Sequence, residues 1–218
     1  YANAHYNLGI ALKEQGTLNA AIASFEKAIK IKPNFAEAYN NLGIVFKEQN
    51  ELPAAIASYK KALNIKPKYP EAYNNLGNAY KAQSDLAAAI NSYKNAIRLK
   101  PRFSQAHVNL GVAYKEIGNL DKALDSIIKS LELKNDDPSA HLNLGIIHQK
   151  LGNLEQALTS VVKSLELDPN NSIALMNLGG LYYNLGNLDQ ALSATDKSLE
   201  LNPDNPDAYI NLGLIYQE

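Results

Sequence analysis

Asparagine is the residue whose spacing in this chain is most regular. The tripeptide Asn-Leu-Gly recurs every 34 residues without an insertion or deletion, and its asparagines are Asn7, Asn41, Asn75, Asn109, Asn143, Asn177 and Asn211. A carboxamide carries both donor and acceptor groups, so one side chain can pair with a peptide N–H and C=O together. If the fold lays these side chains in one row, the row can hold an extended peptide by its backbone.

Residues for other chemistry are absent or placed on packing faces. The chain has no Cys and four His, and these histidines (His5, His107, His141 and His148) take the place of aromatic residues within the repeat. Core packing is therefore expected for them in preference to metal ligation. No His-Glu-x-x-His pattern, phosphate-binding glycine loop or nucleophile elbow occurs. We expect no enzymatic activity, cofactor or metal in this chain.

The spacing of apolar residues in each 34-residue repeat predicts two amphipathic helices, which we name A and B. In residues 36–69, Tyr39, Leu42, Gly43 and Phe46 have the i, i+3, i+4, i+7 spacing of one helical face, and a second such face starts at Leu52. The residues expected at the joint tolerate a left-handed helix end, and they are Gly16, Asn50, Ser84, Gly118, Gly152 and Gly186. We number the positions of a unit from 1, so the recurring Asn is position 6.

The spacing predicts a single array over residues 1–218. Its full repeats are 2–35, 36–69, 70–103, 104–137, 138–171 and 172–205, and residues 206–218 form helix A of a seventh repeat. Because the chain begins without Met and stops one helix into a unit, we expect it to be a fragment of a longer protein.

Residues 70–103 carry a complete family pattern, made of Tyr73, Leu76, Gly77, Tyr80, Ala89, Tyr93, Ala96 and Pro101. In these residues the chain resembles the tetratricopeptide repeat (TPR). The resemblance implies an all-α fold, a right-handed superhelix (α-solenoid) of helix-turn-helix repeats. Position 6 points about 150° away from the apolar face of helix A, and in the family that side lines the inner groove.

The wording Ala-Tyr-Asn-Asn-Leu-Gly is similar to the repeats of O-linked N-acetylglucosamine transferases and of bacterial TPR proteins. In those transferases the corresponding asparagine ladder holds peptides, and the resemblance carries this role to all seven asparagines here. The alternative is that the asparagines bond to each other or to water. Nothing in the chain resembles the transferase catalytic domain.

The later repeats depart from the family pattern at two positions. Position 24 changes from an aromatic residue to Ile127, Val161 and Thr195, and position 27 changes from Ala to Ser130, Ser164 and Ser198. We expect a smaller contact between helices A and B in the second half, and the same fold.

Charge is distributed unevenly along the chain, although the net charge is only −1. Residues 1–103 carry 14 Lys and Arg against 7 Asp and Glu, whereas residues 104–218 carry 7 against 15. This is either a solvated outer face or the sign of a ligand or neighbour bound with a preferred polarity. The net charge and the lack of a basic groove count against nucleic-acid binding. Without a membrane-length apolar run or a signal peptide, we expect no membrane insertion and a cytoplasmic location.

Position 25 of helix B is polar in most repeats but apolar in two neighbouring ones. There Ile128 and Val162 could form a contact for self-association, and so a homo-oligomer. The alternative is local filling beside the smaller Ile127 and Val161.

Together these features predict a non-catalytic protein–protein interaction module that binds a protein or an extended peptide in its concave groove. Two rivals stay open at this point. The array could be the substrate-recognition arm of a larger enzyme such as a protein glycosyltransferase, or it could be a structural, self-assembling scaffold.

Overall fold

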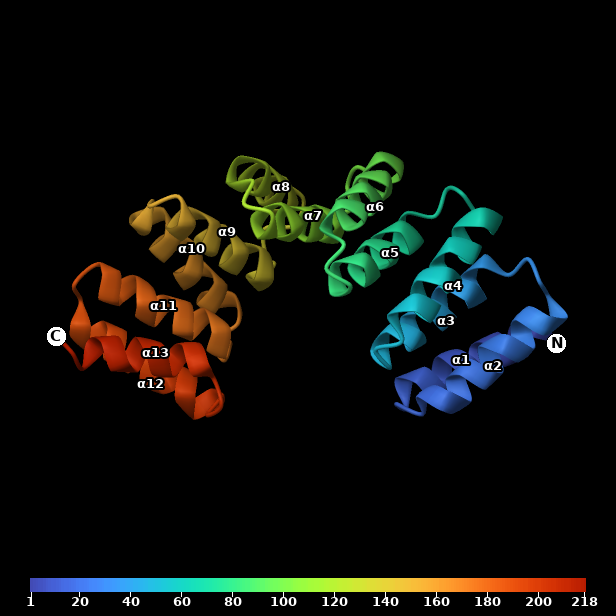
Figure 1. The fold of residues 1–218 in the computed structure, drawn as a ribbon, viewed down its shortest axis with the longest axis horizontal. Helices are drawn as coiled ribbons and strands as arrows, with labels where there is room; N and C mark the ends of the chain where they lie inside the picture. Colours follow the sequence, from blue (N-terminus) through green and yellow to red (C-terminus); the bar gives the residue numbers. More distant parts are fainter. The chain divides into compact units, whose positions relative to one another are not determined.

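The computed structural model describes residues 1–218 and contains 13 α-helices and no strand (Figure 1). The A helices are α1 (Ala2–Glu14), α3 (Ala36–Glu48), α5 (Pro70–Ala82), α7 (Ser104–Glu116), α9 (Pro138–Lys150), α11 (Ser172–Asn184) and α13 (Pro206–Ile215). The B helices are α2 (Leu18–Ile31), α4 (Leu52–Ile65), α6 (Leu86–Leu99), α8 (Leu120–Leu133), α10 (Leu154–Leu167) and α12 (Leu188–Leu201).

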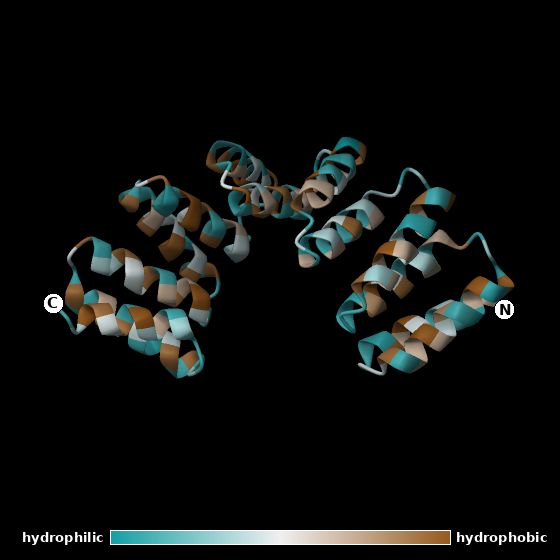
Figure 2. Cartoon of the chain, in the orientation of Figure 1, coloured by the Kyte–Doolittle hydropathy of each residue, from teal (hydrophilic) through white to brown (hydrophobic).

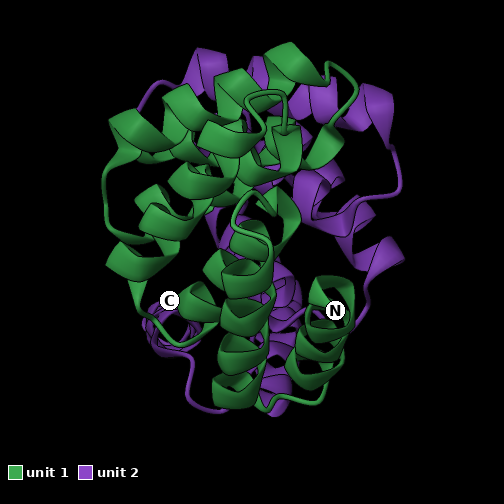
Figure 3. Ribbon diagram, turned by 90° about the vertical axis from the view of Figure 1, so that its right-hand side faces the viewer, with its two compact units in different colours: residues 1–117 green, residues 118–218 purple.

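The chain divides into two compact units, residues 1–117 and residues 118–218, which Figure 3 colours green and purple. The boundary lies inside the predicted fourth repeat, 104–137, between its two helices. Unit 1 contains α1 to α7 and unit 2 contains α8 to α13.

Within each unit, every helix packs against its neighbours along the chain. In unit 1, α1 packs on α2, α3 on α4 and α5 on α6, and each B helix also contacts the next A helix. Unit 2 repeats this arrangement with α9 on α10 and α11 on α12. The predicted all-α fold of stacked helix pairs is confirmed.

The close approach of helices A and B depends on small residues at fixed positions. The alanines at position 20 are fully buried, and they are Ala21, Ala55, Ala89, Ala123, Ala157 and Ala191. Across from them, the glycine at position 8 lies against the side chain at position 24, as Gly43 does against the ring of Tyr59. Figure 2 shows hydrophobic and hydrophilic segments along every helix, as expected when only one face of each helix is buried.

The joint between helices A and B uses the predicted left-handed backbone in all six complete pairs. Four of the joint residues are glycines, but Asn50 and Ser84 take the same conformation with φ of 62° and 63°. Residues other than glycine rarely adopt positive φ, and Asn is among those that do so most often, so the same turn forms at all six joints although their residues differ.

Candidate functional site

The A helices of each unit lie closer to one another than the B helices do. In unit 1, α1 contacts α3, α3 contacts α5 and α5 contacts α7, whereas α2, α4 and α6 make no such contact with each other. In unit 2 the same holds for α9, α11 and α13 against α8, α10 and α12. Each stack is therefore tighter on its A-helix side, which makes that side the inner, concave one within the unit.

In unit 1, the asparagines at position 6 tie each A helix to the one before it. The Nδ2 of Asn41 donates to the Oη of Tyr6 at 3.0 Å and to the backbone carbonyl of Glu37 at 3.0 Å. In the next two repeats, Nδ2 of Asn75 donates to Oδ1 of Asn40 at 3.1 Å, and Nδ2 of Asn109 to Oδ1 of Asn74 at 2.8 Å. The three partners on the preceding A helix, Tyr6, Asn40 and Asn74, all stand at position 5 of the preceding repeat.

In unit 2, the position-6 asparagines also use Nδ2 for bonds to the backbone. Asn143 donates to the carbonyl of Ser139 at 2.8 Å, and Asn177 donates to the carbonyl of Ile173 at 2.8 Å. Asn211 donates to the carbonyl of Met176 at 2.9 Å, again at position 5 of the preceding repeat.

These bonds decide which end of the amide is left for a ligand. A backbone carbonyl only accepts hydrogen bonds, so the group facing the carbonyl of Glu37, Ile173 or Met176 must be the NH₂ end of the amide. The Oδ1 atoms of Asn41, Asn75, Asn177 and Asn211 accept no hydrogen bond from the chain, and these side chains are partly exposed. An amide NH₂ group has two N–H donors, of which Asn41 uses both and Asn75, Asn177 and Asn211 each use one. The row therefore presents all four oxygens as acceptors but only part of its donors.

Asn7 and Asn109 differ from the rest of the row. Asn7 is exposed, whereas the other asparagines of the row are partly buried. The Oδ1 of Asn109 accepts a hydrogen bond from Nε2 of Gln105 at 3.2 Å. That bond uses one of the two lone pairs of this oxygen, so Asn109 can accept only one further hydrogen bond from a ligand.

Sequence reasoning missed the position-5 partners of this row. Asn40 and Asn74 are buried, with 5% and 6% of their surfaces exposed. Their side-chain oxygens, Oδ1, accept hydrogen bonds from the asparagines of the next repeat. Without these bonds the buried amides would be left unsatisfied and would destabilise the fold. The sequence feature that points to these partners is the Asn-Asn doublet at positions 5 and 6. The position-5 Asn accepts a hydrogen bond from the next repeat, and the position-6 Asn donates one to the preceding repeat.

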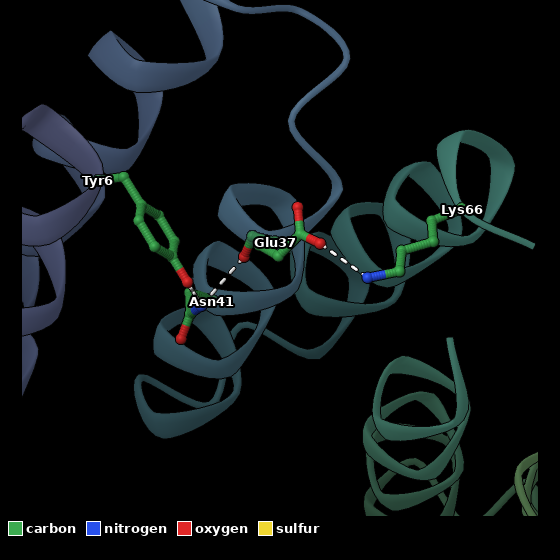
Figure 4. Close-up of polar contacts among 4 residues, drawn as sticks. All are labelled: Tyr6, Glu37, Asn41 and Lys66. Atoms are coloured by element: carbon green, nitrogen blue, oxygen red, sulfur yellow. Dashed lines mark hydrogen bonds and ion pairs between the residues drawn. The ribbon is translucent and has the colours of Figure 1, made fainter. Parts of the chain in front are cut away.

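Tyr6, Glu37, Asn41 and Lys66 form a polar cluster at the start of the row (Figure 4). Burial and the nearby Glu37 carboxylate raise the pKa of Tyr6, so its hydroxyl stays neutral. The hydrogen bond from Nζ of Lys66, 2.8 Å from Oε1 of Glu37, lowers the pKa of that carboxyl group. The Glu37 carboxylate is thus charged at neutral pH, and its ion pair with Lys66 holds this end of α3 against α4.

The proposed self-association residues lie on two B helices of unit 2. Ile128 on α8 is 42% exposed, whereas Val162 on α10 is half-buried. Val162 lines a pocket of about 530 Å³ together with Leu144, Leu158 and His141. The backbones of α8 and α10 do not approach each other closely, and Ile128 does not line this pocket.

The four histidines lie where the sequence places them, on packing faces. Nε2 of His107 is 3.0 Å from the carbonyl of Pro101, and Nε2 of His141 is 2.8 Å from that of Asn135. No group of three or more His, Asp or Glu side chains is arranged to hold a metal ion. None of the 13 helices is both long and apolar enough to cross a membrane.

Comparisons with known proteins agree with this geometry. Residues 2–218 match the TPR family model described as the cilia and flagella-associated protein 70 C-terminal domain. A search of the curated proteins found no match. The likeness to glycosyltransferase repeats rests on the sequence wording alone.

Solved structures of TPR proteins share the fold. PilF of Pseudomonas aeruginosa is similar with a TM-score of 0.86 at 23% identity, over 97% of this chain and 96% of its own. PilW, a type IV pilus biogenesis factor, gives a TM-score of 0.87 at 21% identity, over 97% of this chain and 98% of its own. YrrB, a TPR protein with an unusual peptide-binding site, gives 0.66 at 28% identity, over 87% of this chain and 97% of its own.

Proposed function

Because the chain belongs to the tetratricopeptide-repeat family of the cilia and flagella-associated protein 70 C-terminal domain, we propose that it is a non-catalytic module that binds an extended peptide along its A helices. The observation that carries this proposal is that Oδ1 of the position-6 asparagines Asn41, Asn75 and Asn211 accepts no hydrogen bond from the chain, while Nδ2 of each donates to a neighbour and the side chain stays partly exposed. The peptide-binding site of YrrB, named for that protein, supports a peptide as the ligand class.

The proposed chemistry is acceptance of peptide N–H groups. An amide oxygen held by its own NH₂ group loses little conformational entropy on binding, so the row is preorganised. Backbone N–H groups are common to every peptide except at proline, and the row therefore selects an extended conformation more than a sequence.

Spacing in the row suits a peptide in the polyproline II conformation. Packed helices lie about 8–10 Å apart, and a polyproline II strand rises about 3.1 Å per residue with three residues per turn. Every third N–H then faces the same side at a spacing of about 9 Å. Within unit 1, successive A helices would each accept one such N–H.

The test uses a library of random, fluorescein-labelled 15-residue peptides screened against the full chain. Replacing Asn41 and Asn75 with Ala removes two acceptors, each contributing about 1 kcal/mol, so affinity for a selected peptide falls roughly 10–30-fold. Asn64 and Asn91 are exposed on B helices, and changing them to Ala is the matched control that leaves affinity unchanged. Circular dichroism reports whether the helices stay intact.

A second probe separates backbone recognition from side-chain recognition. The selected peptide is made again with N-methyl groups at every third residue, which removes the proposed donors and leaves the side chains in place. Weaker binding of this peptide supports the Oδ1 row as the site. Equal binding of the two peptides, or equal loss in the control variant, would contradict it.

The finer alternatives stay predictions. A role as the substrate-recognition arm of a larger enzyme, self-association through Ile128 and Val162, and a cytoplasmic location each follow from the sequence and await their own tests. Light scattering of Ile128→Glu beside the parent tests the second of these.

A further inference from the structure

The net charge of this molecule changes sign between its two units. Unit 1 carries 15 Lys and Arg against 8 Asp and Glu, a net charge of +7, and unit 2 carries 6 against 14, a net charge of −8. A change of sign at a structural boundary is more specific than a gradual drift in surface composition. The question is which surface of each unit carries the excess.

The end of helix B, with the loop that follows it, carries much of the excess in both units. In unit 1, positions 29, 31 and 33 hold seven exposed cations, which we name the basic edge: Lys30, Lys32, Lys66, Lys68, Arg98, Lys100 and Arg102. In unit 2 the same three positions hold six anions, which we name the acidic edge: Glu132, Asp136, Glu166, Asp168, Glu200 and Asp204. The basic edge contains no acidic residue, and the acidic edge contains one cation, Lys134.

The basic edge is ordered by its own neighbours. The Nζ atoms of Lys32, Lys66 and Lys100 lie 4.4, 4.5 and 4.7 Å from the ring centroids of the aromatic residue three positions later. Two of these lysines also pair with exposed carboxylates, at 2.8 Å for Lys66 and 3.0 Å for Lys100. Cation–π contacts of this kind hold the ammonium groups in one row without neutralising them.

Most of the charge on both edges is available to a partner. Lys68 and Arg102 make no ion pair, and neither do Asp136, Glu200 and Asp204. Glu132 and Glu166 pair only with exposed lysines one helical turn earlier. Exposed pairs of this kind are weak and can be exchanged for others.

We infer that the basic edge of unit 1 in one copy of this chain binds the acidic edge of unit 2 in a second copy. The two edges are built from the same three positions of the same 34-residue repeat, so their charges recur with the same spacing along a stack. Matched periodicity lets several opposite charges meet at once, which sets both the partner and its register. This association is independent of the peptide-binding proposal, because it uses the ends of B helices.

A second copy fits better than a polyanion. A nucleic acid or other polyanion would be drawn to the basic edge and repelled by unit 2, whose net charge is of the opposite sign to unit 1. A second copy of this chain offers an acidic edge built on the same spacing, and two copies together carry a net charge of only −2.

The test measures the mass of the full chain by sedimentation velocity and light scattering over a concentration series. At about 20 mM salt the chain self-associates, and at about 500 mM salt, where the Debye length is short, the dissociation constant rises at least about tenfold. A chain that stays monomeric at low salt, or that associates equally at both salts, overturns the inference.

Charge reversal identifies the surface. Lys68→Glu, Arg98→Glu and Arg102→Glu together lower the net charge of the basic edge from +7 to +1 and leave the acidic edge intact. Asp136→Lys, Glu200→Lys and Asp204→Lys together change the net charge of the acidic edge from −5 to +1 and leave the basic edge intact. Each variant alone is monomeric at low salt, and mixing the two restores a heteromeric complex. All six positions are exposed, and circular dichroism verifies that the fold is kept.

The matched control changes the same amount of charge elsewhere. Lys27, Lys47 and Lys61 are exposed on unit 1 outside the basic edge, and their joint replacement with Glu leaves self-association in place. Loss of association in this control equal to that in the edge variant would show a net-charge effect and overturn the inference. So would loss in Ile128→Glu combined with retention in the edge variants, or binding of a heparin probe without any self-association.

Discussion

Units 1 and 2 build the same helix pair with different chemistry at the contact between A and B. In unit 1, position 24 is aromatic and fully or almost fully buried, as in Phe25, Tyr59 and Tyr93. In unit 2 the corresponding Ile127, Val161 and Thr195 are equally buried but smaller.

Serine compensates for part of the lost volume in unit 2. At position 27, where unit 1 has Ala, the Oγ of Ser164 donates to the carbonyl of Pro138 at 2.8 Å. Ser198 donates in the same way to the carbonyl of Ser172 at 2.8 Å. The hydroxyl thus bonds helix B to the first residue of helix A across the same contact.

The start of helix A also differs between the units. Unit 1 places an aromatic residue at position 34, such as Tyr69, whose pKa burial raises to about 12, and no side chain caps the helix. Unit 2 places Asp137, Asn171 and Asn205 there, and each accepts a hydrogen bond from a backbone N–H of the first turn. The repeat therefore requires a filled contact between its helices, which either apolar area or hydrogen bonds can provide, although Oγ1 of Thr195 at this contact has no hydrogen-bond partner.

The largest test of this comparison removes the side chain at position 24. Tyr93→Ala deletes a fully buried ring and should lower the free energy of unfolding by about 3–5 kcal/mol. Val161→Ala in unit 2 deletes two methyl groups and should cost about 2 kcal/mol. Denaturant unfolding followed by circular dichroism measures both, and Tyr93→Phe, which loses only the 2.8 Å bond to Oδ1 of Asn78, is the control. Equal costs in the two units would refute the contrast.

A second test concerns the glycine at position 8. A methyl group on Gly77 would lie 2.5 Å from Cε1 of Tyr93, so Gly77→Ala should destabilise the protein by about 1–3 kcal/mol through overpacking. Gly213 has no neighbouring atom within 4 Å of such a methyl group. Gly213→Ala should therefore be neutral or stabilise α13 by up to about 1 kcal/mol. Thermal melts of the two variants should shift in different directions, and a common direction would show that the ring does not set the requirement.

A third test removes a hydrogen bond between helices A and B in unit 2, where less apolar area is buried between them than in unit 1. Ser198→Ala leaves the packing volume almost unchanged but deletes the donor to the carbonyl of Ser172, at a cost of about 1 kcal/mol. Ser193→Ala, on the exposed face of the same helix, provides the matched control. If both changes have the same effect on the unfolding midpoint, the hydroxyl contributes no more than an exposed one.

The smallest effect concerns His148, which replaces an aromatic residue at position 11 of unit 2. Burial lowers its pKa below the ordinary value of 6.5, and its Nδ1 has no hydrogen-bond partner. The unfolded chain then binds a proton more readily than the folded one, so stability falls as pH drops below 6.5. The variant His148→Tyr should not show this loss. The free energy of unfolding of the variant minus that of the parent should therefore increase from pH 8 to pH 5, as measured by denaturant unfolding. A gap that stays constant with pH would show that His148 does not titrate in this way.

For the candidate site, the sequence predicted which residues form the row but not how each amide is turned. The position-6 asparagines were found from their period, and their side of helix A followed from helical geometry. Their orientation depends on Tyr6, Asn40 and Asn74, which lie 35 residues earlier in the chain than their partners. The Asn-Asn doublet is the one sequence feature that points to such contacts, and it does not give their geometry, because they exist only after two repeats have stacked.

The sequence by itself determined the helix pairs, their period and the left-handed joints, because these depend on local backbone preference and on apolar spacing along a single helix. Only the tertiary structure decided that Nδ2 donates within the chain in six of the seven row asparagines. Those bonds join separate helices or bind a carbonyl of the same helix, and neither can be read from the sequence. The division at Ile117 and Gly118 is likewise a property of packing. The sequence of one repeat determines the fold of its helix pair, and the contacts between neighbouring repeats determine which groups on the surface can bind a ligand.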